Sequence, residues 1–253
     1  MKLAGSGRIL LWNGGSLWIG HAGAATAIHS HHAVQISLAF ANAGLRLSRS
    51  DGEWQSYHAA IVAAHQAHAF DGGGELVGNI FVEPESTQGQ VLHQRALAHG
   101  ILRIDDGEIN EDVVALLHAY RTVSEEPVLV AAARNLIARL AVNTNLASTA
   151  LDPRIERAIK RIREKISEPI LLADIAQSVH LSPDRFRHLF LEQAGIRFRP
   201  YVLWLRIELA LSAYTANRSL TEAAQAGGFA DSAHFTRTFR DMFGIAPSSI
   251  QIE

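Results

Sequence analysis

Leu172-Ala173-Asp174-Ile175-Ala176 and Glu222-Ala223-Ala224-Gln225 open two related stretches, and this internal repeat decides the fold of the C-terminal half. When the alanines are aligned, the aromatic and glycine positions that follow coincide, with one extra residue in the second turn. The coinciding pairs are Phe186 and Phe235, Phe190 and Phe239, Gly195 and Gly244, and Ile196 and Ile245. A repeat of this size indicates one supersecondary unit used twice. Its order, a short helix, a tight turn and a second helix, is that of a helix-turn-helix.

Capping signals set the limits of the second helix in each unit. Ser182 and Gly195 bracket a helix over 183–194. Serine is a preferred N-cap, and glycine readily adopts the left-handed backbone that ends many helices. Asp231 takes the N-cap position of the equivalent helix over 232–243. The two second helices are therefore expected to have the same length and the same place in their units.

The flanking helices carry signals of the same kind. Ser219 followed three residues later by Glu222 predicts a capping box at the start of the second unit. A long helix over about 200–216 is expected to connect the two units. Asp152-Pro153 starts a further helix ahead of the first unit, with aspartate as N-cap and proline in the first turn.

Helical periodicity gives each second helix a buried face and an exposed face. Phe186 and Phe190 turn inward in the first helix, and Phe235, Phe239 and Met242 turn inward in the second. A major groove admits one helix, whose residues near the N-terminal end read the base edges. The outward residues that we take as candidate DNA contacts are Asp184, Arg185, Arg187, His188, Ser232, His234, Thr236, Arg237 and Arg240.

Side-chain chemistry divides these candidates into base contacts and phosphate contacts. Arg237 is the leading candidate for a base contact, because its guanidinium can pair with O6 and N7 of guanine. Arg187 and His188 follow. Asp184 can only accept a hydrogen bond, for example from the amino group of cytosine. The residues expected at phosphates, which set register without carrying sequence information, are Arg185, Thr238 and Arg240.

The alternative is a helical interaction module without a nucleic-acid partner. Amphipathic helices that end in glycine are common in helical bundles, where surface arginines are simply solvated. Two units in register with matched aromatic positions favour the DNA-binding interpretation over this one. DNA affinity that falls steeply with salt would exclude the alternative.

The stretch from about Asp152 to Ser248 resembles the DNA-binding domain of the AraC-type (arabinose-regulator-like) transcription regulators. The residues that carry the resemblance are Leu172-Ala173-Asp174-Ile175-Ala176, Leu181-Ser182, Arg185-Phe186, Leu189-Phe190, Gly195, Tyr201, Arg206, Ala210, Ala224, Gly228-Phe229, Asp231, Phe235, Arg237, Phe239-Arg240, Gly244 and Pro247-Ser248. The resemblance implies two helix-turn-helix subdomains, joined by a rigid helix, that enter successive major-groove segments of double-stranded DNA. It also implies a transcription regulator, more often an activator than a repressor, that works with RNA polymerase.

The sequence departs from that family at two places. Ala223 and Gly227 stand where bulkier apolar residues are usual, so the first helix of the second unit is expected to pack loosely. Glycine in a helix interior costs about 1 kcal/mol relative to alanine. Ile250-Gln251 replaces the usual aromatic-basic pair after the final Pro-Ser. The operator sequence is therefore not predictable from the chain.

Composition fits a cytoplasmic protein of two domains. The 253 residues are enough for two cores, and the absence of cysteine excludes disulfides and thiolate metal sites. No apolar run approaches the length of a membrane span, and the first residues lack a secretion signal. From Leu151 onward there are 14 basic and 12 acidic residues, against 9 and 13 before it. The charge difference supports two domains, predicted at 1–145 and 152–253, with Asn143 to Thr149 as linker.

The N-terminal half predicts a β-rich domain followed by helices. Short apolar runs over 16–20, 34–40, 59–64 and 76–82 alternate with turn residues and predict strands of a sandwich or small barrel. Helical periods follow over about 86–98, 110–122 and 127–141. Residues from about Arg8 to Glu85 resemble the cupin-like sensor domain of many such regulators. The expected fold class is therefore α+β, a cupin-like β-barrel with trailing helices before an all-α DNA-binding domain.

Four polar residues in this half form the candidate ligand site. His29, His31 and Gln35 stand where metal-binding cupins have a His-x-His-x-x-x-Glu element, and His68 matches the later single histidine. Glutamine lacks the charge of glutamate and is a poor ligand for first-row metals. We therefore expect a small organic effector, no cofactor and no bound metal, and keep a metal on the three histidines as an alternative. Trp12, Trp18 and Trp54 are candidate walls of an apolar pocket.

Enzymatic activity is not expected. No nucleophile-base arrangement, phosphate loop or dinucleotide fingerprint is found in the sequence. The alternative is a metal-dependent cupin enzyme, or a metal sensor, fused to the DNA-binding domain. The apolar stripes of the trailing helices are expected either to cover the barrel or to form a homodimer, with a slight preference for the dimer.

Overall fold

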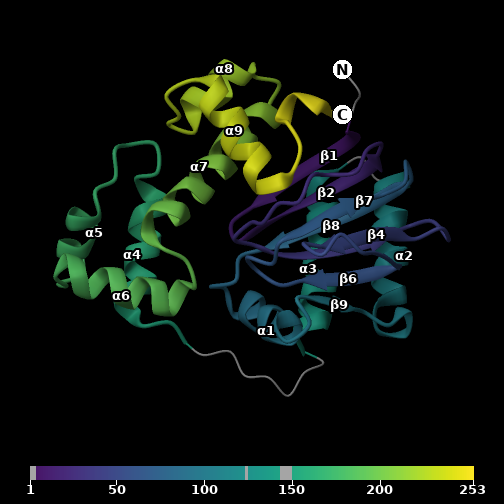
Figure 1. Ribbon diagram of the computed structural model, residues 1–253, viewed down its shortest axis with the longest axis horizontal. Helices are drawn as coiled ribbons and strands as arrows, with labels where there is room; N and C mark the ends of the chain where they lie inside the picture. Colours follow the sequence, from purple (N-terminus) through teal and green to yellow (C-terminus); the bar gives the residue numbers. More distant parts are fainter. Residues whose placement is uncertain (1–3, 123–124, 143–149) are drawn as a thin grey trace. The chain divides into compact units, whose positions relative to one another are not determined.

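The computed structural model describes residues 4–122, 125–142 and 150–253 (Figure 1). The chain divides into two compact units, residues 1–148 with 240–253, and residues 149–239. Grouping of the C-terminal segment Arg240–Glu253 with the first unit was not anticipated, and the predicted domain limits at 145 and 152 stay a prediction. The expected linker, Asn143 to Thr149, lies outside the described residues. None of the described helices is long and apolar enough to cross a membrane.

Two β-sheets form the base of the first unit. The larger sheet has the order β10-β1-β2-β8-β3-β6-β9 and the smaller one the order β5-β4-β7. The strands are β1 (Gly5–Trp12), β2 (Gly15–Ala22), β3 (Val34–Ala39), β4 (Leu45–Arg49), β5 (Trp54–Tyr57), β6 (Ala59–Val62), β7 (His68–Asp71), β8 (Leu76–Val82), β9 (Ile101–Arg103) and β10 (Ile250–Ile252). Neighbouring strands are antiparallel, except that β10 runs parallel to β1. The four predicted strands correspond to β2, β3, β6 and β8.

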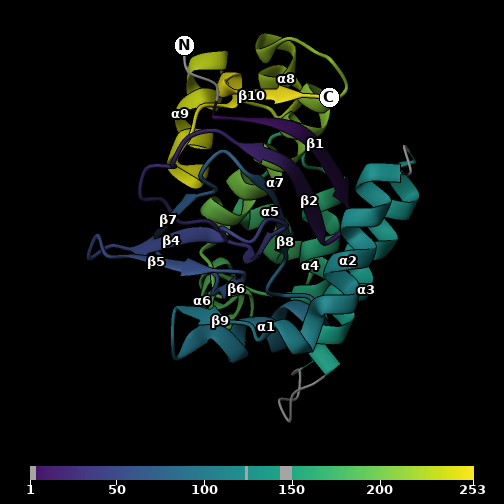
Figure 2. The ribbon, with the colours of Figure 1, turned by 90° about the vertical axis from the view of Figure 1, so that its right-hand side faces the viewer.

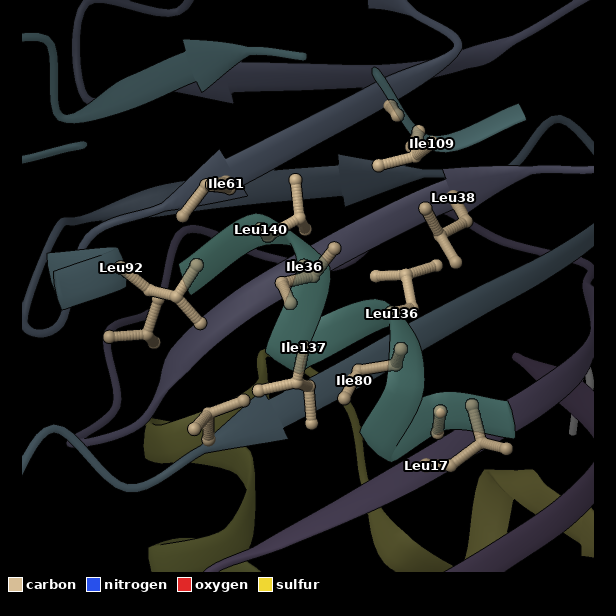
Figure 3. Close-up of a cluster of buried hydrophobic side chains, with 14 of the residues drawn as sticks. Leu17, Ile36, Leu38, Ile61, Ile80, Leu92, Ile109, Leu136, Ile137 and Leu140 are labelled. Carbon is tan, nitrogen blue, oxygen red and sulfur yellow. The ribbon is translucent and has the colours of Figure 1, made fainter. Parts of the chain in front are cut away.

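The larger sheet has two chemically different faces. Successive side chains on a strand point to opposite sides, so alternate residues share a face. In β3, Ile36 and Leu38 belong to the main apolar core, while Gln35 and Ser37 are buried polar residues on the other side. Figure 3 shows Ile36, Leu38 and Ile80 of this core beside Leu136 and Leu140 of the helix that covers them.

Three helices cover the apolar face: α1 (Thr87–Leu97), α2 (Asp106–Thr122) and α3 (Glu126–Val142). In Figure 2, α2 and α3 run side by side along the sheet. All three helices were predicted, but α2 begins earlier than the expected Asn110, because Asp106 and Glu108 place favourable acidic groups in its first turn and Ile109 is buried. The buried stripe of α3 packs on the sheet within the chain, and the homodimer stays a prediction.

The second unit is helical throughout, and the end of its last helix reaches into the first unit's residues. Its helices are α4 (Pro153–Glu164), α5 (Leu172–Ser178), α6 (Pro183–Ala194), α7 (Phe198–Thr215), α8 (Leu220–Ala226) and α9 (Ser232–Phe243). A short 3-10 helix, η1 (Pro247–Ser249), precedes β10. The long α7 connects α6 with α8 (Figure 1), as the repeat predicts. The capping box of Ser219 and Glu222 is formed.

Aromatic contacts hold each helix-turn-helix together. Phe190 lies 5.2 Å from Tyr201 and 5.9 Å from Phe198, both on α7, measured between ring centroids. In the second unit of the repeat, Phe235 lies 5.4 Å from Phe229 and 5.9 Å from Phe239. The predicted inward aromatic positions are thus confirmed. Met242 is only half-buried.

The expected loose packing of α8 is wrong. A Cβ atom on Gly227 would lie 2.6 Å from the carbonyl oxygen of Arg206 and 2.8 Å from Cβ of Ala210, both on α7. Ala223 and Ala224 are almost completely buried on the same helix. The small residues therefore let the two helix backbones approach each other closely, and they leave no gap.

Gly227→Ala is expected to destabilise the protein by about 1–3 kcal/mol, because the added methyl group overlaps a backbone oxygen that cannot move alone. Gly107→Ala is the matched control, since its Cβ meets no atom within 4 Å and it lies in the first turn of α2. Alanine there should be neutral or stabilise by up to about 1 kcal/mol. Urea unfolding followed by circular dichroism measures both. Equal stability of the two variants would contradict the close approach of α7 and α8.

Candidate DNA-binding helices and ligand cavity

Helix α6 presents its predicted contact residues to solvent. The hydroxyl of Ser182 accepts a hydrogen bond from the backbone N–H of Arg185, and Gly195 ends the helix with a φ of 68°. Burial of Phe186, Leu189 and Phe190 fixes the rotation of the helix about its axis. The predicted contact residues Asp184, Arg185, Arg187 and His188 are all exposed.

Two of these residues form an ion pair with each other. Nη1 of Arg187 donates to Oδ1 of Asp184 at 2.7 Å, one helical turn apart. Both side chains are largely exposed, at 57% for Arg187 and 83% for Asp184, so the pair contributes little to stability. Its effect is to hold the guanidinium beside a carboxylate instead of free in solvent.

Helix α9 repeats the arrangement with a different cap. Oδ1 of Asp231 accepts a hydrogen bond from the backbone N–H of His234 at 2.7 Å. Arg237 and Arg240 are exposed. The remaining candidates on this helix are less accessible: Ser232, His234 and Thr236 are half-buried, and Thr238 is buried. The ring of His234 lies edge-on to Phe229 at 5.2 Å.

The polar face of the larger sheet, together with the C-terminal segment, lines a cavity of about 110 Å³ in the first unit. Its walls are mainly apolar and aromatic. Phe243, whose ring centroid lies 4.8 Å from Trp18 and 5.7 Å from Phe81, closes one side. His29 and Gln35 also line it. Of the three tryptophans considered from the sequence, Trp18 lines the cavity, Trp12 packs against the main core and Trp54 is exposed.

Backbone pairing brings the histidines together. The N–H of His29 donates to the carbonyl of His68, and the N–H of His68 donates back, each at 2.9 Å. Residues paired in this way point to the same side of the sheet, and the two ring centroids are 4.3 Å apart. His31 completes the group, with its ring centroid 5.2 Å from that of His68. The structure therefore brings together all three predicted histidines.

Gln35 connects this cluster to neighbouring strands. Its Oε1 lies 3.0 Å from Nε2 of His31 and 3.2 Å from Nε2 of His68. Its Nε2 donates to Oγ of Ser37 at 2.7 Å and to Oδ1 of Asn79 at 3.1 Å. Ser37 and Asn79 were not singled out from the sequence, although both follow the alternation of β3 and β8.

Burial keeps the cluster uncharged at neutral pH. Burial lowers the pKa of His31 to about 3, and the neighbouring His29 lowers it further. Burial also lowers the pKa of His29, and it brings the pKa of His68 well below its usual value. Neutral imidazoles are the form that binds metal ions or accepts hydrogen bonds.

A second polar cluster, missed from the sequence, lies at the start of β3. Nε2 of His32 is 2.9 Å from Oε2 of Glu85, with both side chains buried, and Nδ1 of His32 is 3.3 Å from Nε2 of His65. Burial lowers the pKa of His65 to about 4. These contacts tie β3 to the turn before α1. Adjacent histidines such as His31 and His32 thus serve two different clusters because they point to opposite sides.

Residues 175–251 match the protein family described as a helix-turn-helix domain. The chain is 34% identical over 89 residues to the uncharacterized HTH-type transcriptional regulator YpdC of Escherichia coli, which covers 34% of this chain and 30% of YpdC. It is 30% identical over 118 residues to the arabinose operon regulatory protein of Salmonella typhimurium, or 46% of this chain and 42% of that protein. The matches thus span less than half the length of these relatives. The C-terminal region is a helix-turn-helix domain, and within that class it is of the AraC type.

The structure as a whole is similar to ToxT of Vibrio cholerae. Apo ToxT gives a TM-score of 0.63 at 14% identity, covering 95% of this chain and 97% of ToxT. ToxT with bound unsaturated fatty acid gives a TM-score of 0.54 at 15% identity, covering 92% of each chain. At this identity the likeness shows the fold alone. It confirms the predicted α+β class, a β domain followed by helix-turn-helix units.

Asp184→Ala is expected to raise affinity for DNA of any sequence, because it removes a negative charge near the phosphates and releases Arg187 from its ion pair. Stability should fall by less than about 1 kcal/mol. Glu192→Ala, exposed farther along the same helix, is the charge-matched control and should act more weakly. Fluorescence anisotropy with labelled duplexes measures both. Loss of affinity confined to a preferred sequence would instead assign Asp184 to a base.

Proposed function

We propose that this protein is a sequence-specific DNA-binding transcription regulator whose first unit binds a small-molecule effector. The observation that carries the proposal is the pair of AraC-type units, each presenting a helix with exposed arginine near its N-terminal end. Helices α6 and α9 occupy equivalent places in the repeat, with Arg187 on one and Arg237 on the other. Helices presented in this way suit successive segments of a major groove.

The two arginines differ in how readily they reach a base. Arg187 is held by Asp184. Among the described residues, no ion pair or hydrogen bond is given for the side chain of Arg237, which is exposed on α9. A guanidinium without an ion pair to break loses less on binding, and it can form two hydrogen bonds with one guanine. Arg237 is therefore the base-reading residue of the proposal.

The cavity supplies a route from effector to DNA. Phe243, Ile245 and Ile250 line it, and Phe243 is the last residue of α9. A ligand that displaces the Phe243 ring acts on a helix that also carries Arg237. Such a ligand favours one arrangement of α9 over another by as much as its affinities for the two arrangements differ.

The resemblance to AraC-type regulators supports the remaining parts of the proposal. They are activation more often than repression, action together with RNA polymerase on double-stranded DNA, a homodimer on paired sites, and a cytoplasmic location. The effector is a small molecule with an apolar body, because Trp18, Phe81 and Phe243 surround the cavity and leave His29 and Gln35 for its polar end. ToxT crystallised with an unsaturated fatty acid is a precedent for an apolar ligand in this fold.

Arg237→Ala is expected to weaken binding to the preferred sequence by about 1–3 kcal/mol and to relax the preference at one base pair. The preferred sequence is first selected from random duplexes with the unmodified protein. Arg161→Ala, exposed on α4, removes the same charge away from both reading helices and is the control. Anisotropy titrations on selected and random DNA at two salt concentrations give the comparison. Equal losses on both DNAs would show that Arg237 contacts phosphate.

A further inference from the structure

Three buried imidazoles and one amide oxygen meet at the cavity of the first unit. The ligand atoms of His29, His31 and His68 all lie within 4.8 Å of one another. Each residue is less than a tenth exposed, and His29 and Gln35 border the cavity itself. The cluster is thus shielded from bulk water on most sides and accessible from one.

Hydrogen bonds to the main chain fix which nitrogen of each ring carries the proton. Nδ1 of His29, His31 and His68 lies 2.9 Å from a backbone carbonyl oxygen, those of Ala27, Ala33 and Gln66 respectively. A carbonyl oxygen only accepts, so each Nδ1 is the donor. In a neutral imidazole the other nitrogen, Nε2, then presents a lone pair. This carbonyl contact is the usual support of a metal-binding histidine.

The amide of Gln35 turns its oxygen, and not its nitrogen, toward these lone pairs. Oε1 lies 3.0 Å from Nε2 of His31 and 3.2 Å from Nε2 of His68, while both amide protons are directed to Ser37 and Asn79. Two imidazole nitrogens and one oxygen therefore face one another as acceptors with no proton between them. Such atoms repel each other at this distance unless a cation lies among them.

The spacing suits a first-row transition metal. Ligands about 2.1 Å from an ion lie about 3.0 Å apart at a right angle and about 3.4 Å apart in a tetrahedron. The two contacts of Gln35 Oε1 fall in this range. Imidazole is a preferred ligand of Zn²⁺, Ni²⁺, Fe²⁺ and Co²⁺.

We propose that His29, His31 and His68, with the amide oxygen of Gln35, bind one divalent transition-metal ion at the cavity. This deepens the proposed sensor function, on which its regulatory meaning rests, by naming an inorganic ligand for the same cavity. The sequence alone favoured an organic effector, because an amide oxygen is a weak ligand. The structure changes that weight, since the oxygen is held in the ligand orientation by two hydrogen bonds.

The test is metal binding by the full chain, purified without affinity nickel and stripped with chelator. Titration with Co²⁺, followed by its visible absorption, should show one equivalent bound, and Zn²⁺ should displace it. His31→Ala and His68→Ala should each weaken binding at least 100-fold. His99→Ala and His118→Ala, which are exposed histidines outside the cluster, are the controls and should bind like the unmodified protein. Circular dichroism verifies the fold of each variant.

Gln35→Glu gives a second, opposite readout that a damaged fold cannot mimic. A carboxylate adds charge at the same position, so Co²⁺ affinity should rise at least tenfold. Absence of any bound Co²⁺ or Zn²⁺ in the unmodified protein, or binding that survives both histidine substitutions, would overturn the proposal. An amide that instead turns its NH₂ toward the imidazoles predicts that outcome.

DNA binding is measured separately on the metal-loaded and metal-free protein. A change in affinity between them supports the regulatory role of the site. Metal bound with the same DNA affinity would leave the metal site intact and contradict only its control of DNA binding. Loss of all DNA binding in both forms would contradict the proposed function and not the metal site.

Discussion

The two faces of the larger sheet cannot be exchanged, and the first unit depends on this constraint. In β3, Ile36 and Leu38 face the helices while Gln35 and Ser37 face the cavity. A shift of one residue in strand pairing would move the amide into the apolar core and the isoleucine into the polar cluster. Leaving a buried amide without partners costs about 1–3 kcal/mol, so the register that satisfies Gln35 also positions the histidines around it.

The second unit relies on a different device, close approach between helix backbones. Aromatic rings from α6 pack on α7, while Gly227 and Ala223 let α8 lie directly against the other end of the same helix. Both halves of the repeat are therefore held on one element. Interiors packed at this density resist small displacements. The α5–α6 pair and α8 consequently keep their places relative to α7, which is what reading two groove segments at fixed spacing requires.

Much of this could be predicted from the sequence where local signals decide the structure. Caps at Ser182 and Asp231, the repeat and the strand alternation all depend on neighbours close in the chain. Packing of α8 could not be predicted, because small residues look like missing ones until the partner helix is known. Phe243 was missed as a cavity residue for a similar reason, since nothing near it in sequence indicates Trp18. The histidine cluster was predicted, but the orientation of Gln35 depends on Ser37 and Asn79 across the strands.

Parallel pairing of β10 with β1 joins residues near position 5 to residues near position 250. A ribosome releases the first unit's other strands long before it makes this one, with all of residues 149–239 synthesised in between. During that interval β1 exposes an unpaired edge, which is a site for unwanted strand pairing. The nascent chain thus completes its first unit only after the helix-turn-helix region has emerged, so a truncated product lacking the C-terminal segment would also have an incomplete sensor sheet.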